Sequence, residues 1–412
     1  MSTKLFCWMN YFGYSSTAND DNGQAPRDMD ITVNPNNVNE VHIAGVLSWM
    51  STDGGTNFNL TSQWTHTNAT NANVGYCHAD IDILEYIHDK LYVGSDGGIF
   101  VADDPLTIDT DYYTDLTPGL GIRQFYKIGV NQNSPEIVSG GSQDNGTSVM
   151  DTNGDWTDWL GADGMESFVD KNDNDILYGT SQNGTLYKSI NGGSSYFGLS
   201  EPEDKSGNWI TPFEQDPITQ NVIYSGYDEV YKSVDGGVNW ASISQNFGGN
   251  LNHLKIAPSD NNILFAARGG NLYKTIDGGN TNWRTLTGFS GNINSIAIHP
   301  LDPNKVAIAT TSTQKVYVSI DGGINWTSYL KDLPNFNALA LVWQENDDNG
   351  LYVGMNYGVY YIDDTTPNNW IPFINNLPNV EISELEINTA TNKIYAATYG
   401  RGLWKSDVFI TN

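Results

Sequence analysis

The chain has little positive charge. Its 412 residues carry 19 Lys and Arg against 48 Asp and Glu, which gives a formal net charge of −29. A surface this acidic repels phosphate backbones and anionic lipid, so nucleic acid and membrane surfaces are not expected as partners. The five arginines also leave little room for a basic patch that would hold a strongly anionic polysaccharide.

Cysteine and long apolar runs are scarce as well. The two cysteines, Cys7 and Cys77, exclude a disulfide scaffold and leave open whether they pair or stay separate thiols. No stretch approaches the roughly 20 apolar residues of a membrane span, so no membrane insertion is expected. The start of the chain lacks the apolar core of a signal peptide and runs directly into strand-like sequence from Leu5 to Phe12. We therefore expect a domain of a longer exported protein, secreted or at the cell surface.

Turn-forming and aromatic residues are abundant. The chain has 42 Gly, 15 Pro and 12% aromatic residues, with only 16% charged residues. Aromatic and β-branched residues are spread along the whole length, which excludes a disordered chain. The composition is typical of a turn-rich β protein.

An eight-residue motif, here called the box, recurs along the chain. Residues 233–240 read Ser-Val-Asp-Gly-Gly-Val-Asn-Trp, and close copies occupy 319–326, 51–58, 189–196 and 275–283. Two glycines permit a tight turn, and the Asp or Asn side chain caps its amides. We expect the box residues to be structural; they are Asp53, Asn191, Asp235, Asp277 and Asp321.

The box marks a repeat of 42 to 44 residues, which with four short strands per unit is typical of a propeller. Nine units open near Asp30, Asp82, Phe125, Ser167, Ile210, His253, Ser295, Ala338 and Ser383. We predict an all-β fold, a single β-propeller of eight to ten blades with nine preferred, over residues 1–412. A smaller ring with strands left over from a neighbour is the alternative.

The prediction joins the two ends of the chain in one blade. Residues 1–27 form an N-terminal segment, and the repeats run from 28 to 412. The ninth unit stops at Trp404–Asp407 without an outer strand. Leu5–Phe12 is the candidate to supply that strand and close the ring.

The repeats resemble the Asp-box (BNR-repeat) superfamily, which includes xyloglucan-active glycoside hydrolases, sialidases and the propeller of sortilin-like receptors. The whole chain looks most like the BNR-repeat proteins exported by Bacteroidetes. The motifs that carry the resemblance are residues 77–80, 93–98, 140–146, 161–166 and 397–404. The resemblance implies a propeller in a multidomain secreted protein, and it leaves the biochemical role open.

The resemblance also allows two enzymatic activities to be weighed. A sialidase needs an arginine triad, and five scattered arginines without an Arg-Ile-Pro opening motif argue against one. A glycoside hydrolase needs two carboxylates across a groove, which the abundant acids permit. Xyloglucan-active enzymes pair two propellers to build that groove, whereas this chain is expected to hold one.

Candidate functional residues lie on the face where inner strands begin, opposite the boxes. Asp144 and Asp163 are the candidate catalytic acids, because crowded carboxylates raise one another's pKa. His78, Asp80 and Asp96 form a candidate calcium site, since oxygen-rich ligation favours that ion; no cofactor is otherwise required. Further candidate substrate-binding residues are His78, Asp80, Asp96, Arg123, Gln143, Glu166, Tyr399 and Arg401. The alternative is that these acids cap turns, as Asp and Asn before Gly often do.

The sequence thus leads to two hypotheses of function. The first is recognition of an extracellular neutral glycan, with or without its hydrolysis. The second is a non-catalytic interaction module of a larger surface protein. Acids tied up in backbone caps or a plugged channel would favour the second, because the fold alone does not choose.

Overall fold

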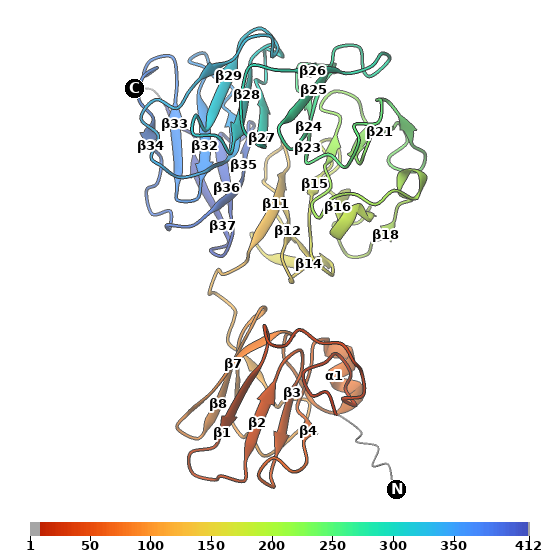
Figure 1. The fold of residues 1–412 in the computed structure, drawn as a ribbon, viewed down its shortest axis with the longest axis vertical. Coiled ribbons are helices and arrows are strands. Elements are labelled where there is room, and N and C mark those ends of the chain that lie inside the picture. Colours follow the sequence, from red (N-terminus) through yellow and green to blue (C-terminus); the bar gives the residue numbers. More distant parts are fainter. Residues whose placement is uncertain (1–8, 411–412) are drawn as a thin grey trace, which may run out of the picture. The chain divides into compact units, whose positions relative to one another are not determined.

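The computed structural model describes residues 9–410 and is almost entirely β. Eight four-stranded antiparallel sheets, one three-stranded sheet and one two-stranded sheet are present in this range. The chain divides into two compact units, one ending at Leu120 and the other beginning at Gly121 (Figure 1). The predicted propeller class is confirmed.

The first unit contains two four-stranded sheets and a small insertion between them. The first sheet has β1 (Asp30–Val33), β2 (Val41–Ala44), β3 (Ser48–Ser51) and β4 (Asn59–Leu60); the second has β7 (Ile81–Ile87), β8 (Lys90–Ser95), β9 (Gly98–Ala102) and β10 (Thr114–Asp115). The insertion comprises β5 (Ser62–Gln63), α1 (His66–Ala72) and β6 (Gly75–Tyr76). Thr65 caps α1 by accepting a hydrogen bond from the Asn68 N–H.

The second unit contains seven successive sheets, here called blades 1 to 7. Blade 1 consists of β11 (Phe125–Val130), β12 (Val138–Ser142), β13 (Thr147–Met150) and β14 (Trp156–Leu160). Blade 2 consists of β15 (Ser167–Val169), β16 (Leu177–Thr180), β17 (Leu186–Ser189) and β18 (Phe197–Gly198). Blade 3 consists of β19 (Phe213–Gln215), β20 (Ile223–Gly226), β21 (Val230–Ser233) and β22 (Ala241–Ser242). Short 3₁₀ turns lie at η1 (Gln182–Gly184) and η2 (Pro202–Asp204).

Blades 4 to 7 continue the same pattern, except that the last blade has three strands. Blade 4 consists of β23 (His253–Ala257), β24 (Asp260–Arg268), β25 (Asn271–Thr275) and β26 (Arg284–Leu286), and blade 5 of β27 (Ile293–Ile298), β28 (Val306–Thr310), β29 (Val316–Ser319) and β30 (Thr327–Ser328). Blade 6 consists of β31 (Ala338–Trp343), β32 (Leu351–Met355), β33 (Val359–Ile362) and β34 (Ile371–Pro372). Blade 7 consists of β35 (Ile382–Asn388), β36 (Lys393–Thr398) and β37 (Leu403–Asp407).

The seven blades close into a ring. Each inner strand contacts the next, and β35 of blade 7 packs against β11 of blade 1. Across this closure the Glu384 carboxylate accepts a hydrogen bond from the Ile128 N–H at 2.7 Å. The buried Asn388 amide donates to the carbonyls of Asn131 and Asn133 at 2.8 and 2.9 Å. Residues far apart in the sequence therefore form one continuous barrel of inner strands.

This closure corrects the predicted arrangement of the units. Nine repeat units are present, and their inner strands begin close to the predicted positions. The ring holds seven of them, because β11 closes on β35 and the first two sheets form a unit of their own. The domain prediction of one ring over residues 1–412 is thus replaced by the smaller ring that was its alternative.

The N-terminal segment also differs from expectation. Blade 7 has no fourth strand among the described residues. Tyr11 packs instead on Trp49 and Phe58 of the first unit, with ring centroids 5.2 and 5.1 Å apart. The described part of Leu5–Phe12 is therefore not the ring-closing strand, and residues 5–8 lie outside the described range.

The boxes behave as the sequence predicts. In blade 3 the Asp235 carboxylate accepts hydrogen bonds from the Asn239 N–H at 2.9 Å and from the Ser233 hydroxyl at 2.8 Å. Gly236 and Gly237 have φ of 72° and 97°, a region that other residues rarely adopt. The same bonds recur at Asp53, Asp277 and Asp321, and Asn191 makes their neutral equivalent. The box acids are structural.

Two remaining predictions concern the membrane and the cysteines. No helix within the described range is long and apolar enough to cross a membrane. Cys77 is buried, and burial raises the pKa of its thiol above the usual range. Cys7 lies outside the described residues, so its pairing stays a prediction.

Candidate binding channel

A cavity of about 710 Å³ lies along the inner strands of the second unit. All seven inner strands, β11 to β35, contribute to its lining, which extends to the turns that follow them, such as Pro217, Pro258 and Pro300. The cavity is thus the central channel of the ring. Its size falls in the range of ligand sites in proteins.

Nine charged side chains line this channel. Six lie on the inner strands or, for Glu166, directly before one; they are Lys127, Glu166, Glu214, Lys255, Glu384 and Glu386. The other three follow the inner strands; they are Lys171, Asp216 and Glu345. Lys127 pairs with Glu384 across the ring closure at 3.3 Å, and Lys255 pairs with Glu214 between blades 4 and 3 at 2.5 Å. Among the six charges at the inner strands, these pairs leave Glu166 and Glu386 as the surplus acids.

The surplus acids bind their protons unusually tightly. Burial, opposed by the charge of Lys127, raises the pKa of Glu166 to about 8. Burial together with the charge of Glu384 raises the pKa of Glu386 to about 8. The channel therefore gains negative charge as the pH rises through this range.

The surroundings of the channel shift the pKa values of Lys255 and His253 in opposite directions. Burial lowers the pKa of Lys255, but the charges of Glu214 and Glu384 outweigh it and raise that pKa above the usual range. Burial and the charge of Lys127 lower the pKa of His253 to about 3. Its Nε2 lies 3.1 Å from the Ile293 carbonyl. Near neutral pH the lysines are charged and His253 is neutral.

β-Bulges determine which side chains face the strand-start end of the channel. The register shifts after the first residue of β11, β27, β31 and β35. The extra residues are Tyr126, Asn294, Leu339 and Ser383, of which Leu339 and Ser383 line the cavity. A bulge redirects a side chain in this way without ending the strand.

A polar aromatic cluster, formed by Tyr126, Gln143, Trp209 and Tyr399, connects blades 1, 3 and 7 at the strand-start end. The Tyr126 and Tyr399 hydroxyls both donate to the Gln143 side-chain oxygen, the former at 3.0 Å. The Trp209 Nε1–H donates to the Tyr126 hydroxyl at 3.3 Å. Because these contacts span blades that are not neighbours, the cluster lies across that end of the channel. Gln143 and Tyr399 were predicted to be functional, and they belong to this cluster.

The two candidate catalytic acids are close in space, but both oxygens of Asp163 already accept hydrogen bonds from the protein. Asp163 is buried, with 8% of its surface exposed. One of its oxygens accepts the Asp144 backbone N–H at 2.6 Å, and the other accepts the Gln182 side-chain amide. Asp144 has a φ of 55°, so this contact stabilises a left-handed turn. The geometry favours the turn-capping interpretation of Asp163.

The guanidinium groups of the two candidate arginines bond to residues of their own blades, Arg123 in blade 1 and Arg401 in blade 7. Arg123 donates to the Asn145 carbonyl at 2.8 Å and pairs with Asp158 at 2.8 Å. Arg401 is exposed, and its guanidinium donates to the Gly400 carbonyl at 3.3 Å. Neither arginine lines the channel. Glu166 does, and it is the predicted residue that the structure places in the candidate site.

The candidate calcium residues belong to the first unit. The Asp96 N–H donates to the Asp80 carbonyl at 3.2 Å, and the Gln24 amide donates to the Asp80 carboxylate at 2.6 Å. The Nδ1 of His78 lies 3.1 Å from the Ala79 carbonyl. These bonds organise the turn around Asp80, and a calcium site there stays a prediction.

Of the charged residues that line the channel, the sequence analysis named only Glu166 as a site residue. Lys127, Glu214, Lys255, Glu384 and Glu386 lie within or beside apolar inner strands, where strand alternation alone places them on one of two faces. A sign was available for four of them: Lys127, Lys255, Glu384 and Glu386 are charged residues among the apolar residues of their strands.

Comparison with known proteins agrees with the propeller. The family model of sortilin (Sortilin-Vps10; neurotensin receptor 3) matches residues 228–357, which run from β21 to β32. This is less than half of the chain, so the match is a similarity over blades 3 to 6. No curated protein matches the chain.

A solved structure shows the same fold. YCF48 from Cyanidioschyzon merolae has a TM-score of 0.55 to this chain at 12% sequence identity. The alignment covers 70% of this chain and 97% of that one. At this identity the likeness shows the fold alone, a β-propeller of the kind seen here.

Proposed function

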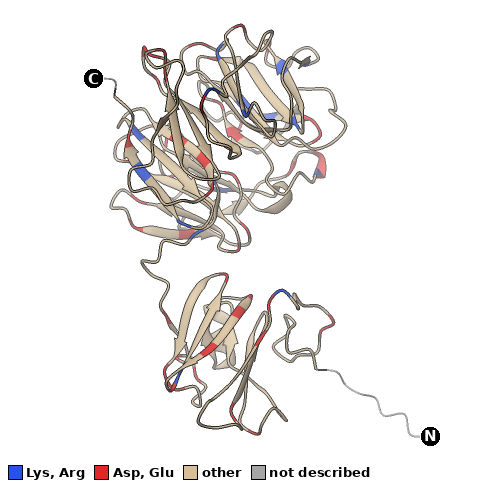
Figure 2. Cartoon of the chain, turned by 60° about the vertical axis from the view of Figure 1, so that its left-hand side comes forward, with Lys and Arg blue, Asp and Glu red and all other residues tan. Residues whose placement is uncertain are grey.

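We propose that the second unit is a non-catalytic interaction module that holds an extended, basic polypeptide segment in its channel. The observation that carries the proposal is the channel itself, in which two ion pairs are accompanied by two surplus glutamates, Glu166 and Glu386. A bound lysine or arginine would stabilise their ionised form. The excess of acidic residues over the molecule would attract the same class of partner (Figure 2).

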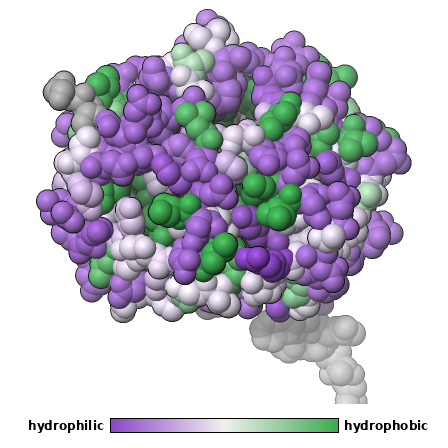
Figure 3. Space-filling model, turned by 90° about the horizontal axis from the view of Figure 1, so that it is seen from above, coloured by the Kyte–Doolittle hydropathy of each residue, from purple (hydrophilic) through white to green (hydrophobic). Residues whose placement is uncertain are grey.

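Two further observations support binding over catalysis. Both oxygens of Asp163 accept hydrogen bonds, one from the Asp144 N–H and one from the Gln182 side-chain amide, which supports a capping role for this acid. Hydrophobic residues on one face of the second unit form small separate groups among hydrophilic ones (Figure 3). That face offers no broad apolar area, so recognition by charge inside the channel is favoured. The proposal keeps the expectation of an exported, multidomain chain.

The test is a binding titration with two synthetic peptides of equal length, (Lys-Ala)₅ and (Glu-Ala)₅, each carrying a fluorescent label. Polarisation at near-physiological salt should show saturable binding of the lysine peptide only. The double variant Glu166→Gln/Glu386→Gln should weaken that binding about tenfold or more, since charged groups inside a protein are poorly screened.

A matched variant separates the channel from general acidity. Glu203→Gln/Asp204→Asn also removes two negative charges, at exposed positions of η2 away from the cavity. It should bind the lysine peptide as the unmodified protein does. Equal losses in the two double variants, or no preference for the lysine peptide, would overturn the proposal.

Glycan recognition is the second candidate, favoured by the exposure of Trp209. Its side chain is 50% exposed and lies beside Tyr126, an arrangement on which a sugar ring can stack. Binding of neutral oligosaccharides that is lost in Trp209→Ala would support this candidate. New reducing ends from neutral plant or algal polysaccharides, lost in Asp144→Asn or Asp163→Asn, would add hydrolysis to it.

A further inference from the structure

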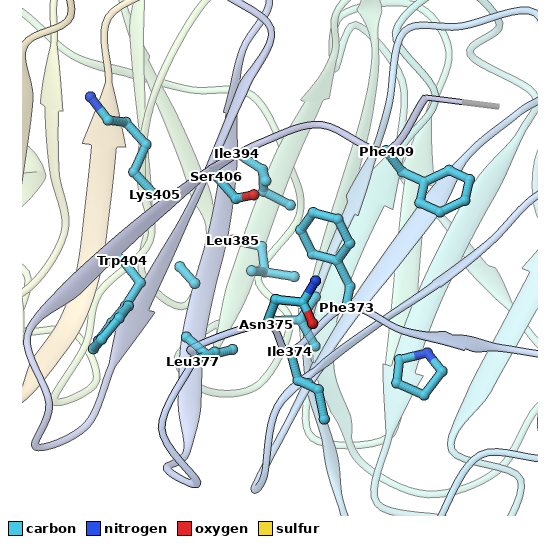
Figure 4. A pocket seen from close by; sticks show the side chains of 13 residues that line it. Phe373, Ile374, Asn375, Leu377, Leu385, Ile394, Trp404, Lys405, Ser406 and Phe409 are labelled. Carbon is cyan, nitrogen blue, oxygen red and sulfur yellow. The ribbon is translucent and has the colours of Figure 1, made fainter. Parts of the chain in front are cut away.

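A pocket of about 240 Å³ lies between blades 6 and 7, beside β37 (Figure 4). Blade 7 contributes Leu385, Ala396 and Trp404 to its lining, and Phe373 and Leu377 contribute from blade 6 and the loop that follows it. Apolar side chains thus form most of its wall. The other blades of the ring show which side chain fills a place of this kind.

Box tryptophans occupy the corresponding place between other blades. Trp283 of blade 4 is 3% exposed and packs in one cluster with residues of blades 3 and 4. Its indole N–H donates to the Ile243 carbonyl of blade 3 at 2.8 Å. Trp370 of blade 6 donates in the same way to the Tyr329 carbonyl of blade 5 at 2.9 Å. Each of these boxes therefore inserts an indole ring between its own blade and the preceding one.

The strand ladders show that the pocket beside β37 is this place in blade 7. Around Trp283, one residue from each of the first three strands of blade 4 belongs to the cluster; these are Leu254, Ala266 and Tyr273, which pair with one another across the sheet. Their counterparts in the ladder of blade 7, in the same order, are Leu385, Ala396 and Trp404. All three counterparts line the pocket.

The acceptor of the indole N–H has a counterpart too. Ile243 is fixed by its own N–H, which donates to the Val230 carbonyl at 2.9 Å. Phe373 makes the same bond to the Val359 carbonyl at 2.8 Å. Because the two residues hold the same place on the preceding blade, the Phe373 carbonyl can accept an indole N–H as the Ile243 carbonyl does.

A side-chain amide that holds the main chain of the tryptophan is also repeated. Gln245, two residues after Ile243, accepts the Trp283 backbone N–H at 2.8 Å and donates to the Trp283 carbonyl at 3.0 Å. Asn375 stands two residues after Phe373 and lines the pocket. It carries the same amide on a side chain one methylene shorter. The pocket therefore has groups for the ring, for its N–H and for the adjoining main chain.

The described residues after β37 leave this place open. The Phe409 N–H donates to the Tyr352 hydroxyl of blade 6 at 2.6 Å. The Phe409 ring stacks on Tyr361, also of blade 6, with centroids 4.4 Å apart. In blades 3 to 6 the corresponding part of the chain forms the box and brings in its tryptophan. Here it runs across the neighbouring blade instead.

We propose that the pocket receives one tryptophan side chain from an extended segment of a partner polypeptide. The indole ring enters between blades 6 and 7, its N–H donates to the Phe373 carbonyl, and Asn375 binds the main chain of the same residue. Lys405 and Ser406 of β37 also line the pocket, and among the described strands β37 pairs only with β36. Residues that flank the tryptophan therefore find main-chain partners along β37. A second copy of this chain is a poorer donor, because box tryptophans such as Trp283 are already buried in its own ring.

The probe is an end-blocked peptide that copies residues 238–242, Val-Asn-Trp-Ala-Ser, with a fluorine atom on its indole ring. Its side chains are uncharged, so the acidic channel does not attract it. Fluorine NMR with the full chain should show a saturable change of the peptide signal, to which the 12 tryptophans of the protein contribute nothing. The unlabelled peptide should displace the probe. The same peptide carrying Trp240→Ala should displace it about tenfold or more weakly, because it lacks the ring that fills the pocket.

A second competitor distinguishes a polypeptide from a small indole compound. N-acetyltryptophanamide carries the ring and one residue of main chain, but it has no flanking residues to pair along β37. It should displace the probe more weakly than the unlabelled peptide does.

Two protein variants locate the binding. Ala396→Phe fills the pocket from β36 and should abolish peptide binding, with the circular dichroism of the sheets unchanged. Asn375→Ala, at an exposed position, should weaken binding roughly threefold to tenfold, because the main chain of the tryptophan loses its hydrogen bonds. Asn368→Ala is the matched control, since it is equally exposed and lies outside the pocket, and it should bind as the unmodified protein does.

Three results would overturn the inference. The first is equal displacement by the tryptophan and alanine peptides, or no binding of the probe. The second is displacement by N-acetyltryptophanamide as strong as that by the peptide, which would make a small indole compound the ligand. The third is self-association of the full chain, seen by sedimentation and removed by Ala396→Phe, which would make a second copy the occupant.

Discussion

At the scale of single residues, the box acids and the channel acids show opposite responses to their surroundings. Hydrogen bonds from Asn239 and Ser233 lower the pKa of Asp235 to about 2. Burial raises the pKa of Glu386 to about 8. The first carboxylate is stabilised in its charged form and the second in its neutral form, so the two make contrary contributions to stability as the pH changes.

For the box we predict that Asp235→Ala lowers the melting temperature by a few degrees near pH 6. A carboxyl whose pKa falls on folding stabilises the fold above the unfolded pKa of 3.8, and this is lost as the pH falls toward 2. The difference from the unmodified protein should therefore shrink in thermal scans at low pH. Asp235→Asn is the matched control, because Asn191 makes the same turn with a neutral side chain. An Asn variant as unstable as the Ala variant would contradict this account.

For the channel we predict that Glu386→Gln stabilises the protein above neutral pH. A carboxyl whose pKa rises on folding makes the fold less stable as the pH rises from 4.5 to about 8. Removing it should raise the free energy of unfolding by roughly 1–2 kcal/mol at pH 8.5, discounted for solvent in the channel, and by nothing near pH 4. Urea denaturation at the two pH values measures this. Glu203→Gln, at an exposed position, should show no such pH dependence.

The same protonation predicts how binding depends on pH. The surplus acids must ionise to hold a basic side chain, so affinity for (Lys-Ala)₅ should rise between pH 7 and 9. Titrations at three pH values would show the increase, and Glu166→Gln/Glu386→Gln should remove it. A flat profile for the unmodified protein would show that these two acids take no part.

At the scale of elements, the strands and turns follow closely from local sequence. The start of each inner strand and the position of each box were predictable because glycine pairs, Asp caps and alternating apolar residues act over a few residues. The bulges at Tyr126 and Ser383 were not, since they depend on the neighbouring strand. For the same reason the charged lining of the channel escaped prediction, whereas Glu166 was found by its position after a turn.

The contact between blades 7 and 1 is the element-scale feature that closes the ring. We predict that Asn388→Ala destabilises the second unit by roughly 1–3 kcal/mol, because the Asn131 and Asn133 carbonyls lose a buried donor. Chemical denaturation followed by tryptophan fluorescence measures the loss. Asn356→Ala, at a partly exposed turn of blade 6, is the control. A change no larger than that of the control would argue against closure between β35 and β11.

At the scale of the whole molecule, the number of blades in the ring could not be read from the repeats. Nine similar units fit one ring or a smaller ring with two units outside it, and both satisfy the same local pattern. What decides is the packing of Phe125 and Ile128 of β11 with Tyr395 and Ala397 of β36, which are some 270 residues away in the chain. Contacts of that separation have no local signature.

The division predicts that residues 121–412 fold without residues 1–120. The isolated fragment should give a single cooperative transition by calorimetry, and the full chain should show the same transition. The fragment should bind (Lys-Ala)₅ as the full chain does. A fragment that stays unfolded would mean that the ring needs the first unit.

The most direct test of the central claim, that the channel of the seven-blade ring is the binding surface, is amide hydrogen exchange of the full chain with and without (Lys-Ala)₅. The account predicts slower exchange in the inner-strand segments that carry the channel charges, β11, β19, β23 and β35, with unchanged exchange in the first unit and in the outer strands. Protection confined to the first unit or to the outer strands, or none at saturating peptide, would contradict it.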